Sequence, residues 1–298
     1  MSCHNGEKYL MEAILSVINQ SYKNWELIFW DNFSSDNSAK IIKNFKDKRI
    51  KYFRSKKKTN LAIARNNAIL KSNGEFICFL DTDDYWLKNK LKIQIKIIKS
   101  NNLISVVFCK YFILNDKLNK LSKHSFMDVT NYNKLAGLIF PQLLNKYIDG
   151  KPLLGPLTIM IKKKILDKIA FDIKLHVFAD FDLFLNLSLT KNFQGINDYL
   201  AVYRLHDSNE SFQSLKKYNI EYVYWYNKIK NNSIYNNFTN FQKIKDQINY
   251  QKFLIYEENK NYFKYIKIFW KTKNIKNVIK ILLNFFLPRF LLKSFRIT

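Results

Sequence analysis

The feature that most constrains the fold is a pair of short apolar runs, each followed directly by an aspartate. WELIFW at 25–30 precedes Asp31, and EFICFL at 75–80 precedes Asp81. Continuous apolar runs of this length are typical of strands that are buried on both faces of a sheet. Such strands need helices on both sides, so the chain is expected to fold as an α/β domain.

Helical patterns separate and follow these two runs. The spacing of apolar residues predicts helices over 7–19, 38–45, 62–71 and 87–99, with one more short strand at 50–53. This alternation of strands and helices implies mostly parallel pairing. Ligands of such sheets bind beyond the carboxyl ends of the strands, which predicts that Asp31 and Asp81 converge on one crevice.

The remainder of the chain is less regular. Residues 103–114 predict one or two strands. Further patterns predict a helix over 132–147 broken at Pro141, a strand at 157–161, helices over 165–170 and 180–190, and a short strand at 201–204. From about residue 211 the sequence indicates helices rich in Lys, Asn and Tyr, and residues 274–294 are basic and strongly apolar.

Charge and cysteine content limit the partners and the compartment. The 298 residues carry 50 Lys and Arg against 24 Asp and Glu, a formal net charge of +26, but only six of the basic residues are Arg. Base-reading proteins rely on Arg for bidentate contacts, so the charge indicates attraction to phosphates in general and no specific nucleic acid. The three cysteines lie far apart, which excludes a disulfide scaffold and a zinc ribbon and favours a reducing compartment. Neither a signal peptide nor a transmembrane helix of about 18 apolar residues is expected.

The sequence DTDD, residues 81–84, places three carboxylates in a turn directly after a strand. Carboxylate oxygens are the ligands that hard divalent cations prefer, and Mg²⁺ typically takes one or two of them together with substrate phosphates. A metal held there neutralises charge on a leaving diphosphate. The alternative interpretation is a polar turn that caps the following helix.

Several segments of the chain resemble the family 2 glycosyltransferases, which have a GT-A fold. They are, in order, HNGEKYLMEAILSVINQSYKNWEL, IFWDNFSSDNS, AIARNNAILKSNGEFICFLDTDDYW, GPLTIMIKKKILDKIAFDIKLHVFADFDLFLNLSL and VYRLHDSNES. The resemblance covers residues 1–212 and implies a GT-A-like, Rossmann-like α/β domain with a mostly parallel sheet flanked by helices. It implies a nucleotide-binding part at 1–110 and an acceptor-side part at 111–212, and the helical, Lys-rich pattern that follows predicts a basic helical C-terminal extension at 213–298.

The donor-site residues follow by matching the motifs of the family. Asp31 matches the acidic residue that hydrogen-bonds the nucleotide base, and a carboxylate can accept from the imide N–H of uracil; helix capping is its alternative role. Arg65 matches the Arg near the base and the phosphates, with a surface salt bridge as the alternative. Asp81 is expected to contact the ribose and Asp83 the metal. These matches imply a nucleotide-sugar donor, UDP-linked, and a divalent metal, Mn²⁺ or Mg²⁺.

The acceptor-side residues follow in the same way. Asp180 matches the second residue of the family's Glu-Asp pair, which implies a general base that takes the proton of the acceptor hydroxyl. Ala179 replaces the Glu, a departure that bears on acceptor recognition, and Asp182 is the reserve candidate. His206 matches a His that in some relatives completes the metal shell or touches the diphosphate; imidazole suits Mn²⁺ better than Mg²⁺, and an exposed loop His is the alternative. Arg204 is a candidate for pairing with phosphate.

The two ends of the chain add further expectations. Family members normally have an apolar first strand before the helix expected at 7–19, whereas Met1 stands past most of it. The resemblance therefore leaves open an inactive, truncated glycosyltransferase. Residues 274–294 predict a basic amphipathic helix on an anionic membrane surface, or an ordinary helix docked on the domain.

The sequence thus predicts an inverting glycosyltransferase of bacterial surface-polysaccharide type. It is expected to move a sugar from a nucleotide diphosphate sugar to a glycan or lipid-linked glycan acceptor in polysaccharide or lipooligosaccharide synthesis. The expected location is cytoplasmic, peripheral on the inner face of the cell membrane. Besides the truncated enzyme, the alternatives are a basic protein that binds polyanions or membranes and a sugar nucleotidyltransferase.

Overall fold

The computed structural model describes residues 1–123, 132–148, 154–210 and 215–258. The chain divides into two compact units, Met1–Asn209 and Glu210–Thr298. The basic apolar segment expected at 274–294 lies outside the described residues. Among the helices within these ranges, none has both the length and the apolar character needed to cross a membrane.

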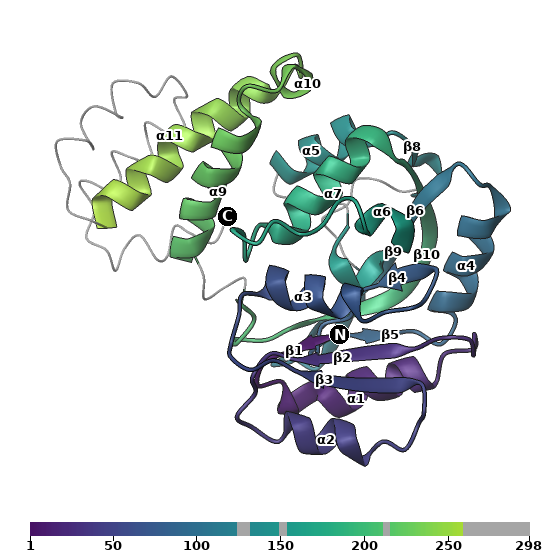
Figure 1. Cartoon of the computed structure of the whole chain (residues 1–298). Helices are drawn as coiled ribbons and strands as arrows, with labels where there is room; N and C mark the ends of the chain where they lie inside the picture. Colours follow the sequence, from purple (N-terminus) through teal and green to yellow (C-terminus); the bar gives the residue numbers. More distant parts are fainter. Residues whose placement is uncertain (124–131, 149–153, 211–214, 259–298) are drawn as a thin grey trace. The chain divides into compact units, whose positions relative to one another are not determined.

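The first unit opens with a three-stranded parallel sheet. Its order is β1 (Ser2–Cys3), β2 (Leu27–Asp31), β3 (Ile50–Arg54). Helices α1 (Glu7–Ile18) and α2 (Ser38–Asn44) lie on one side of this sheet and α3 (Leu61–Leu70) on the other (Figure 1). The helices expected at 7–19, 38–45 and 62–71 are confirmed to within two residues, because each carries a strong local pattern: α1, for example, buries Leu10, Ile14 and Val17 on one face.

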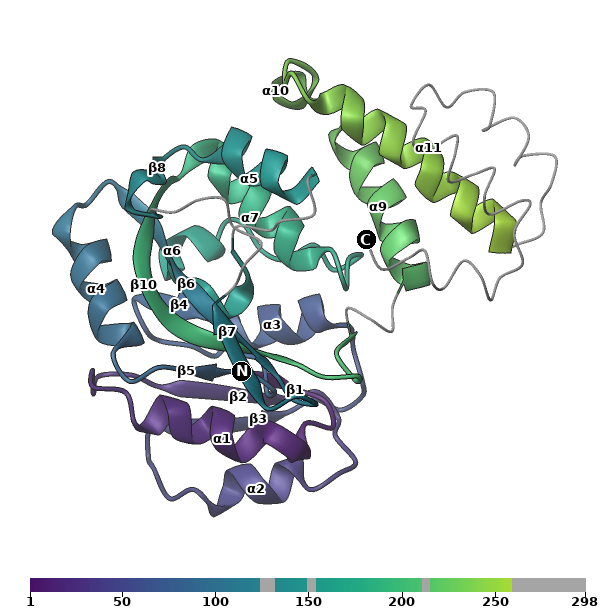
Figure 2. The same ribbon diagram turned by 180° about the vertical axis from the view of Figure 1, so that it is seen from behind.

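A second, larger sheet follows along the chain. Its path is β4-β9-β6-β10-β5, with β7 paired to β6 and β8 to β10. The strands are β4 (Phe76–Cys78), β5 (Tyr85–Trp86), β6 (Ile104–Asn115), β7 (Lys120–Lys123), β8 (Ala136–Gly137), β9 (Ile159–Lys162) and β10 (Asn192–Leu205). Figure 2 shows β7 lying along β6. β6 and β10 pair in parallel and the other pairs are antiparallel. The α/β class is confirmed, and the sheet is mixed rather than mostly parallel, because β5, β7, β8 and β9 run antiparallel to their neighbours β6 and β10.

Several elements differ from the sequence prediction. The strand expected at 201–204 is the end of the 14-residue β10. The helix expected over 132–147 is reduced to α5 (Phe140–Ile148), with a 3-10 turn at Tyr132–Lys134 and β8 before it. Pro141 lies in the first turn of α5, where a helix tolerates a residue without an N–H. The helix at 87–99 becomes α4 (Lys90–Ser100), and 103–114 forms the single strand β6.

The apolar core joins the two sheets. Phe29 of β2, Leu10 and Ile14 of α1, and Val107 of β6 belong to one buried cluster, together with Leu91 of α4. The remaining helices of this unit are the short α6 (Lys163–Leu166) and α7 (Ala179–Thr190), and α7 contacts α5. The core therefore fixes the ends of β2 and β4 relative to each other.

The second unit is helical over its described residues. It contains α9 (Leu215–Ile229), α10 (Ser233–Asn236) and α11 (Phe241–Glu258), and α9 contacts α11. Buried aromatic side chains hold it together: Tyr222, Trp225 and Tyr235 form edge-on ring contacts.

Candidate active site

Asp31 ends β2 and is fully buried, with 0% exposure. The Ser34 N–H donates to its Oδ1 at 2.7 Å, and the Tyr52 hydroxyl donates to its Oδ2 at 2.7 Å. The Arg54 guanidinium lies 3.4 Å from the same Oδ2. Burial and the neighbouring Asp31 raise the pKa of Tyr52, which keeps it a hydrogen-bond donor. Asp31 is thus a rigidly held acceptor, and its partners Tyr52 and Arg54 on β3 are residues that the sequence pattern did not single out.

Arg65 joins two of the predicted site carboxylates. It lies on α3, whose first turn is capped by the Asn60 side chain accepting from the Ile63 N–H at 2.9 Å, and it is only 3% exposed. Its Nη2 donates to Asp81 Oδ1 at 2.9 Å and Oδ2 at 3.2 Å, and its Nη1 donates to Asp180 Oδ1. Although burial opposes the charged form, Asp180 and Asp81 raise the pKa of Arg65, so it stays a cation.

Asp180 lies in the first turn of α7, where the helix dipole favours a negative charge. Burial and the neighbouring Asp81 nevertheless raise its pKa, and Arg65 offsets only part of that effect. Ala179, which stands where the family has a Glu, is fully buried, and Asp182 is 2% exposed. Of the two candidate bases, Asp180 is therefore the one that reaches the Arg65–Asp81 pair.

The DTDD turn brings a second group of predicted residues together. Asp83 Oδ2 lies 3.0 Å from His206 Nε2 and 3.4 Å from Asn209 Nδ2. The other imidazole nitrogen of His206 lies 2.8 Å from the Ser208 hydroxyl. Burial and Asp81 raise the pKa of Asp83, while His206 lowers it. Asn209 was not predicted, although it belongs to the same segment as His206.

Asp84 and Arg204 hold this turn in place through hydrogen bonds. Asp84 is 3% exposed and accepts the Arg204 N–H at 2.9 Å. Burial, Asp83 and Asp81 raise the pKa of Asp84 well above its usual range. The Arg204 guanidinium donates to the Asp83 carbonyl, to Asp116 and to Glu12. Arg204 therefore pairs with the carboxylates of Asp116 and Glu12, and its pairing with a phosphate stays a prediction.

The residues of the turn fit a divalent cation that takes few protein ligands. Among the described residues, no group of three or more His, Cys, Asp or Glu side chains has the geometry of a metal cage. Asp83 and His206 converge instead as two candidate ligands, and Asp81 faces Arg65. The raised pKa values of Asp83 and Asp84 reflect an excess of buried negative charge that a cation would offset. This donor set suits Mg²⁺ or Mn²⁺ whose remaining ligands come from a diphosphate and water.

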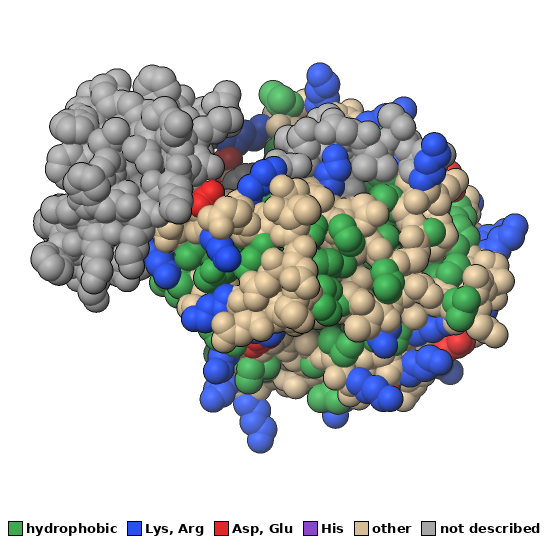
Figure 3. Space-filling view, turned by 90° about the horizontal axis from the view of Figure 1, so that it is seen from above, with side chains coloured by type: hydrophobic (Ala, Val, Ile, Leu, Met, Phe, Trp, Pro, Cys, Tyr) green, Lys and Arg blue, Asp and Glu red, His purple; other side chains and the backbone are tan. Residues whose placement is uncertain are grey.

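The positive charge of the chain is spread out on the face seen in Figure 3. Lys and Arg side chains stand apart from one another along its margin, and apolar side chains lie between them. Nucleic-acid binding favours basic residues gathered in a patch or stripe. The visible face lacks such a patch among its described residues.

The chain is similar to known glycosyltransferases over most of its length. The family described as "Glycosyl transferase family 2" matches residues 1–169. An Escherichia coli relative, "UDP-Glc:alpha-D-GlcNAc-diphosphoundecaprenol beta-1,3-glucosyltransferase WfgD", is 34% identical over 219 residues, which are 73% of this chain and 80% of that protein. The "Putative teichuronic acid biosynthesis glycosyltransferase TuaG" of Bacillus subtilis is 29% identical, with 72% and 79% of the two chains covered. The chain spans only 29% to 37% of some other curated relatives.

Solved structures show the same architecture. "S. aureus TarS 1-349 in complex with UDP-GlcNAc" superposes with a TM-score of 0.60 at 19% identity, over 95% of this chain and 78% of that one. The likeness confirms the GT-A-like α/β fold expected from the sequence.

Proposed function

Because this chain belongs to glycosyl transferase family 2 and is a glycosyltransferase, we propose that it transfers a sugar from a UDP-sugar to a hydroxyl of a glycan or lipid-linked glycan. The relatives WfgD, named as a glucosyltransferase for a lipid diphosphate-linked sugar, and TuaG, named as a putative teichuronic acid enzyme, support a role in cell-surface polysaccharide synthesis. The complex of TarS with UDP-GlcNAc supports a UDP-linked donor.

The observation that carries this proposal is the position of Arg65 between Asp81 and Asp180. Asp81 follows β4 on the proposed donor side. Asp180 lies on α7 on the proposed acceptor side, 115 positions from Arg65 in the sequence. A donor sugar and an acceptor hydroxyl must meet at such a junction. The arrangement supports the division into a nucleotide-binding part at 1–110 and an acceptor-side part at 111–212.

On the donor side, Asp31 and Asp81 hold the nucleoside. Asp31 accepts the imide N–H of uracil, and its charge is held in place by Tyr52 and Arg54. Asp81 accepts a ribose hydroxyl while its position is fixed by Arg65. Asp83 and His206 would hold the divalent cation, which neutralises the charge on the leaving diphosphate when it is bound.

On the acceptor side, Asp180 is the general base. It takes the proton of the acceptor hydroxyl as that oxygen attacks the anomeric carbon, the bond to the diphosphate breaks, and UDP leaves with inversion of configuration. Its raised pKa makes it a better proton acceptor near neutral pH than an ordinary aspartate. Arg65 orients the carboxylate and keeps it ionised.

The test separates chemistry from donor binding. Asp180→Asn keeps a hydrogen-bonding side chain of the same size but removes the base, so transfer should fall by about 10²–10⁴-fold. UDP binding by calorimetry in Mn²⁺ should stay within about 3-fold of the parent, because the base does not contact the nucleotide. The matched control is Asp167→Asn, which changes an exposed carboxylate in the same acceptor-side part of the chain. Unchanged turnover of the Asp180 variant would refute the base assignment.

The extension at 213–298 is proposed to hold the enzyme on the inner membrane surface, where a lipid-linked acceptor lies. Support comes from the basic and apolar composition of 274–294. Binding to anionic vesicles that is lost when 274–298 is removed, with transfer to a soluble acceptor retained, is the expected result.

A further inference from the structure

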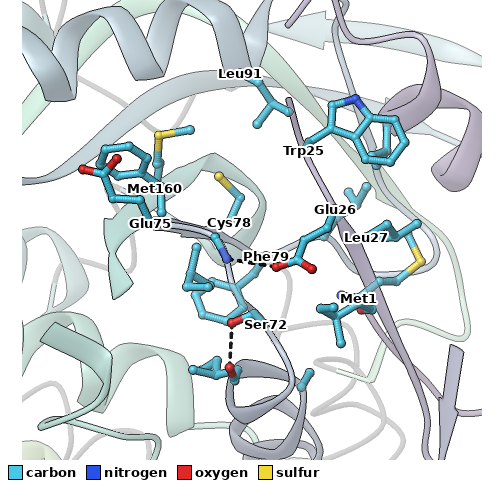
Figure 4. A pocket seen from close by; sticks show the side chains of 18 of the residues that line it. Met1, Trp25, Glu26, Leu27, Ser72, Glu75, Cys78, Phe79, Leu91 and Met160 are labelled. Atoms are coloured by element: carbon cyan, nitrogen blue, oxygen red, sulfur yellow. Dashed lines mark hydrogen bonds between the residues drawn. The ribbon is translucent and has the colours of Figure 1, made fainter. Parts of the chain in front are cut away.

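The hollow interior of the first unit and the segment that follows β10 differ in character. The hollow is a cavity of about 540 Å³ next to β2 and β4, and it is lined mainly by apolar side chains, with Leu91, Cys78 and Met160 around it in Figure 4. The segment from His206 to Asn209 instead carries an imidazole, a hydroxyl and an amide within hydrogen-bond reach of one another. This segment therefore offers the groups that can act on His206, a proposed metal ligand.

The imidazole of His206 has hydrogen-bond partners at both of its nitrogens. Nε2 lies 3.0 Å from Asp83 Oδ2 and 3.3 Å from Asn209 Nδ2, and Nδ1 lies 2.8 Å from the Ser208 hydroxyl. The His206 side chain is only 9% exposed, and its ring centroid lies 5.0 Å from that of Tyr9. Because the ring is packed and held at both nitrogens, the position of its proton can change while its orientation stays the same.

A neutral imidazole carries one N–H, and each of its two tautomers has partners at this place. With the proton on Nε2, the ring donates to Asp83, and the Ser208 hydroxyl donates to Nδ1. With the proton on Nδ1, the ring donates to the Ser208 oxygen, and Nε2 accepts from the Asn209 amide. Ser208 serves both tautomers because a hydroxyl can donate and accept, whereas an ionised Asp83 can only accept and so favours the first.

A divalent cation can be held by Asp83 and His206 together only in the second tautomer. A metal binds the lone pair of a ring nitrogen, so Nε2 must carry no proton. The remaining ring N–H of a metal-bound histidine is in most proteins held by an acceptor, which fixes the tautomer and the ring orientation. In this segment the acceptor that faces Nδ1 is the Ser208 oxygen.

We propose that Ser208 is a positioning residue for the metal, and that its hydroxyl changes from donor to acceptor when the cation binds. The inference rests on the proposed function, which assigns the cation to Asp83 and His206. In the exchange, Nε2 gives its proton to water and Nδ1 takes one from water, so the number of protons on the imidazole is unchanged. Ser208 is exposed, and its hydroxyl proton can therefore turn toward solvent without losing a hydrogen-bond partner.

The affinity of the full chain for Mn²⁺, measured by electron paramagnetic resonance with and without UDP, tests the proposal. Ser208→Ala removes the acceptor, and Mn²⁺ should bind about 10-fold more weakly, the smaller end of the range for such partners, because water can replace part of an exposed hydroxyl. Ser208→Thr keeps the hydroxyl and should restore the affinity of the parent. The matched control is Ser100→Ala, which removes an exposed hydroxyl bonded to the Ile97 carbonyl and should leave the affinity unchanged.

The tautomer of His206 is a second readout that does not depend on sugar transfer. It is measured by ¹⁵N NMR at about pH 8, where imidazoles of ordinary pKa are neutral, with His206→Gln to assign the signals. In EDTA the proton should lie on Nε2 in the parent and in both Ser208 variants, because Asp83 determines this form. With Zn²⁺, a diamagnetic ion that suits imidazole, the proton should lie on Nδ1, and Ser208→Ala should need about 10-fold more Zn²⁺ to reach this state.

The outcomes separate this inference from the proposed function. Equal Mn²⁺ affinity for the parent and Ser208→Ala would overturn the role of Ser208, and so would a metal-bound His206 that keeps its proton on Nε2. A parent chain that takes up no Mn²⁺, with or without UDP, would instead refute the metal assignment itself, and the role of Ser208 with it.

Discussion

Asp31 and Asp81 follow the same sequence pattern, an apolar run that ends in an aspartate, yet the structure gives them opposite surroundings. Asp31 is fully buried among donors, with Ser34, Tyr52 and Arg54 directed at its carboxylate. The Asp81 side chain is 36% exposed and begins a turn with two more carboxylates, Asp83 and Asp84. Burial raises the pKa of both, as does the nearby Asp81. The carboxylate of Asp31 has its hydrogen-bond donors within its own sheet and turn, whereas the carboxylates of the DTDD turn carry an excess of negative charge that Arg65, Arg204 and His206 offset only in part. A rigid base-binding contact needs the first arrangement, and a metal-diphosphate contact needs the second.

Arg65 is the cation that keeps the charged strand end stable, so its removal should give the largest effect. Arg65→Ala leaves two carboxylates without their buried partner, and we expect transfer to fall by about 10³-fold and stability by about 3 kcal/mol. Urea denaturation and a radiolabelled transfer assay measure the two effects. Lys117→Ala, which breaks an exposed ion pair with Asp207, should change stability by less than about 0.5 kcal/mol. A loss for Arg65→Ala as small as this control would contradict the role of Arg65.

Asp83→Asn tests whether the negative charge of the DTDD turn serves to bind a metal ion, by comparing UDP binding with and without the metal. The amide is a weaker ligand, so UDP binding in Mn²⁺ should weaken by about 100-fold, while binding in chelator should be the same for variant and parent. Calorimetric titration at fixed salt, with Mn²⁺ and with EDTA, gives all four values. If the parent binds UDP equally well in both conditions, the turn does not hold a metal that contributes to donor binding.

Asp31→Asn tests the end of β2, where the carboxylate already has hydrogen-bond donors within the protein. The new amide group faces the Tyr52 hydroxyl or Arg54 with a donor in place of an acceptor, which should cost about 1–3 kcal/mol of stability. UDP binding should weaken by about 10-fold, and by the same factor in Mn²⁺ and in EDTA, because the proposed contact of Asp31 is with the base and not with the metal. Tyr52→Phe, which removes one donor to Asp31, should cost about 1 kcal/mol. If Asp31→Asn lost UDP affinity only in Mn²⁺, Asp31 would act through the metal as Asp83 does, and the proposed difference between the two sites would be refuted.

The contrast between these strand ends also shows what the sequence can and cannot predict. The spacing of apolar residues predicted α1, β2 and α3 within two residues, since these elements are determined by local patterns. β10 was predicted as four residues of its 14, because its polar first half is held by pairing with β6 and β8, far away in the sequence.

The site divides in the same way. Family motifs placed Arg65, Asp81 and Asp180 in one site, and the structure brings all three into contact. The contacts of Tyr52 and Arg54 with Asp31 had no motif to indicate them, because they depend on which strand becomes the neighbour of β2. The contacts of Arg204 with Glu12 and Asp116 also had no motif to indicate them, because these partners come from distant segments.

The smallest expected effect is a dependence of stability on pH that arises at the charged strand end alone. Burial, Asp83 and Asp81 raise the pKa of Asp84 in the folded chain above its value near 3.9 in the unfolded chain. Between these two values the folded state binds the extra proton, so this group makes the chain less stable as the pH rises through that window. Asp84→Asn keeps an oxygen to accept the Arg204 N–H and removes the charge. In EDTA, we therefore expect the variant to be about 1 kcal/mol more stable than the parent at pH 7, with the difference shrinking toward pH 5.

Asp47 supplies a control of opposite sign, because its hydrogen bonds with Arg49 lower its pKa to about 2. Asp47→Asn should be less stable than the parent at pH 7, and this difference should disappear only as the pH falls toward 2. Urea denaturation at a series of pH values measures both, and an Asp84→Asn variant that is less stable than the parent at pH 7 would show that the turn carries no charge excess.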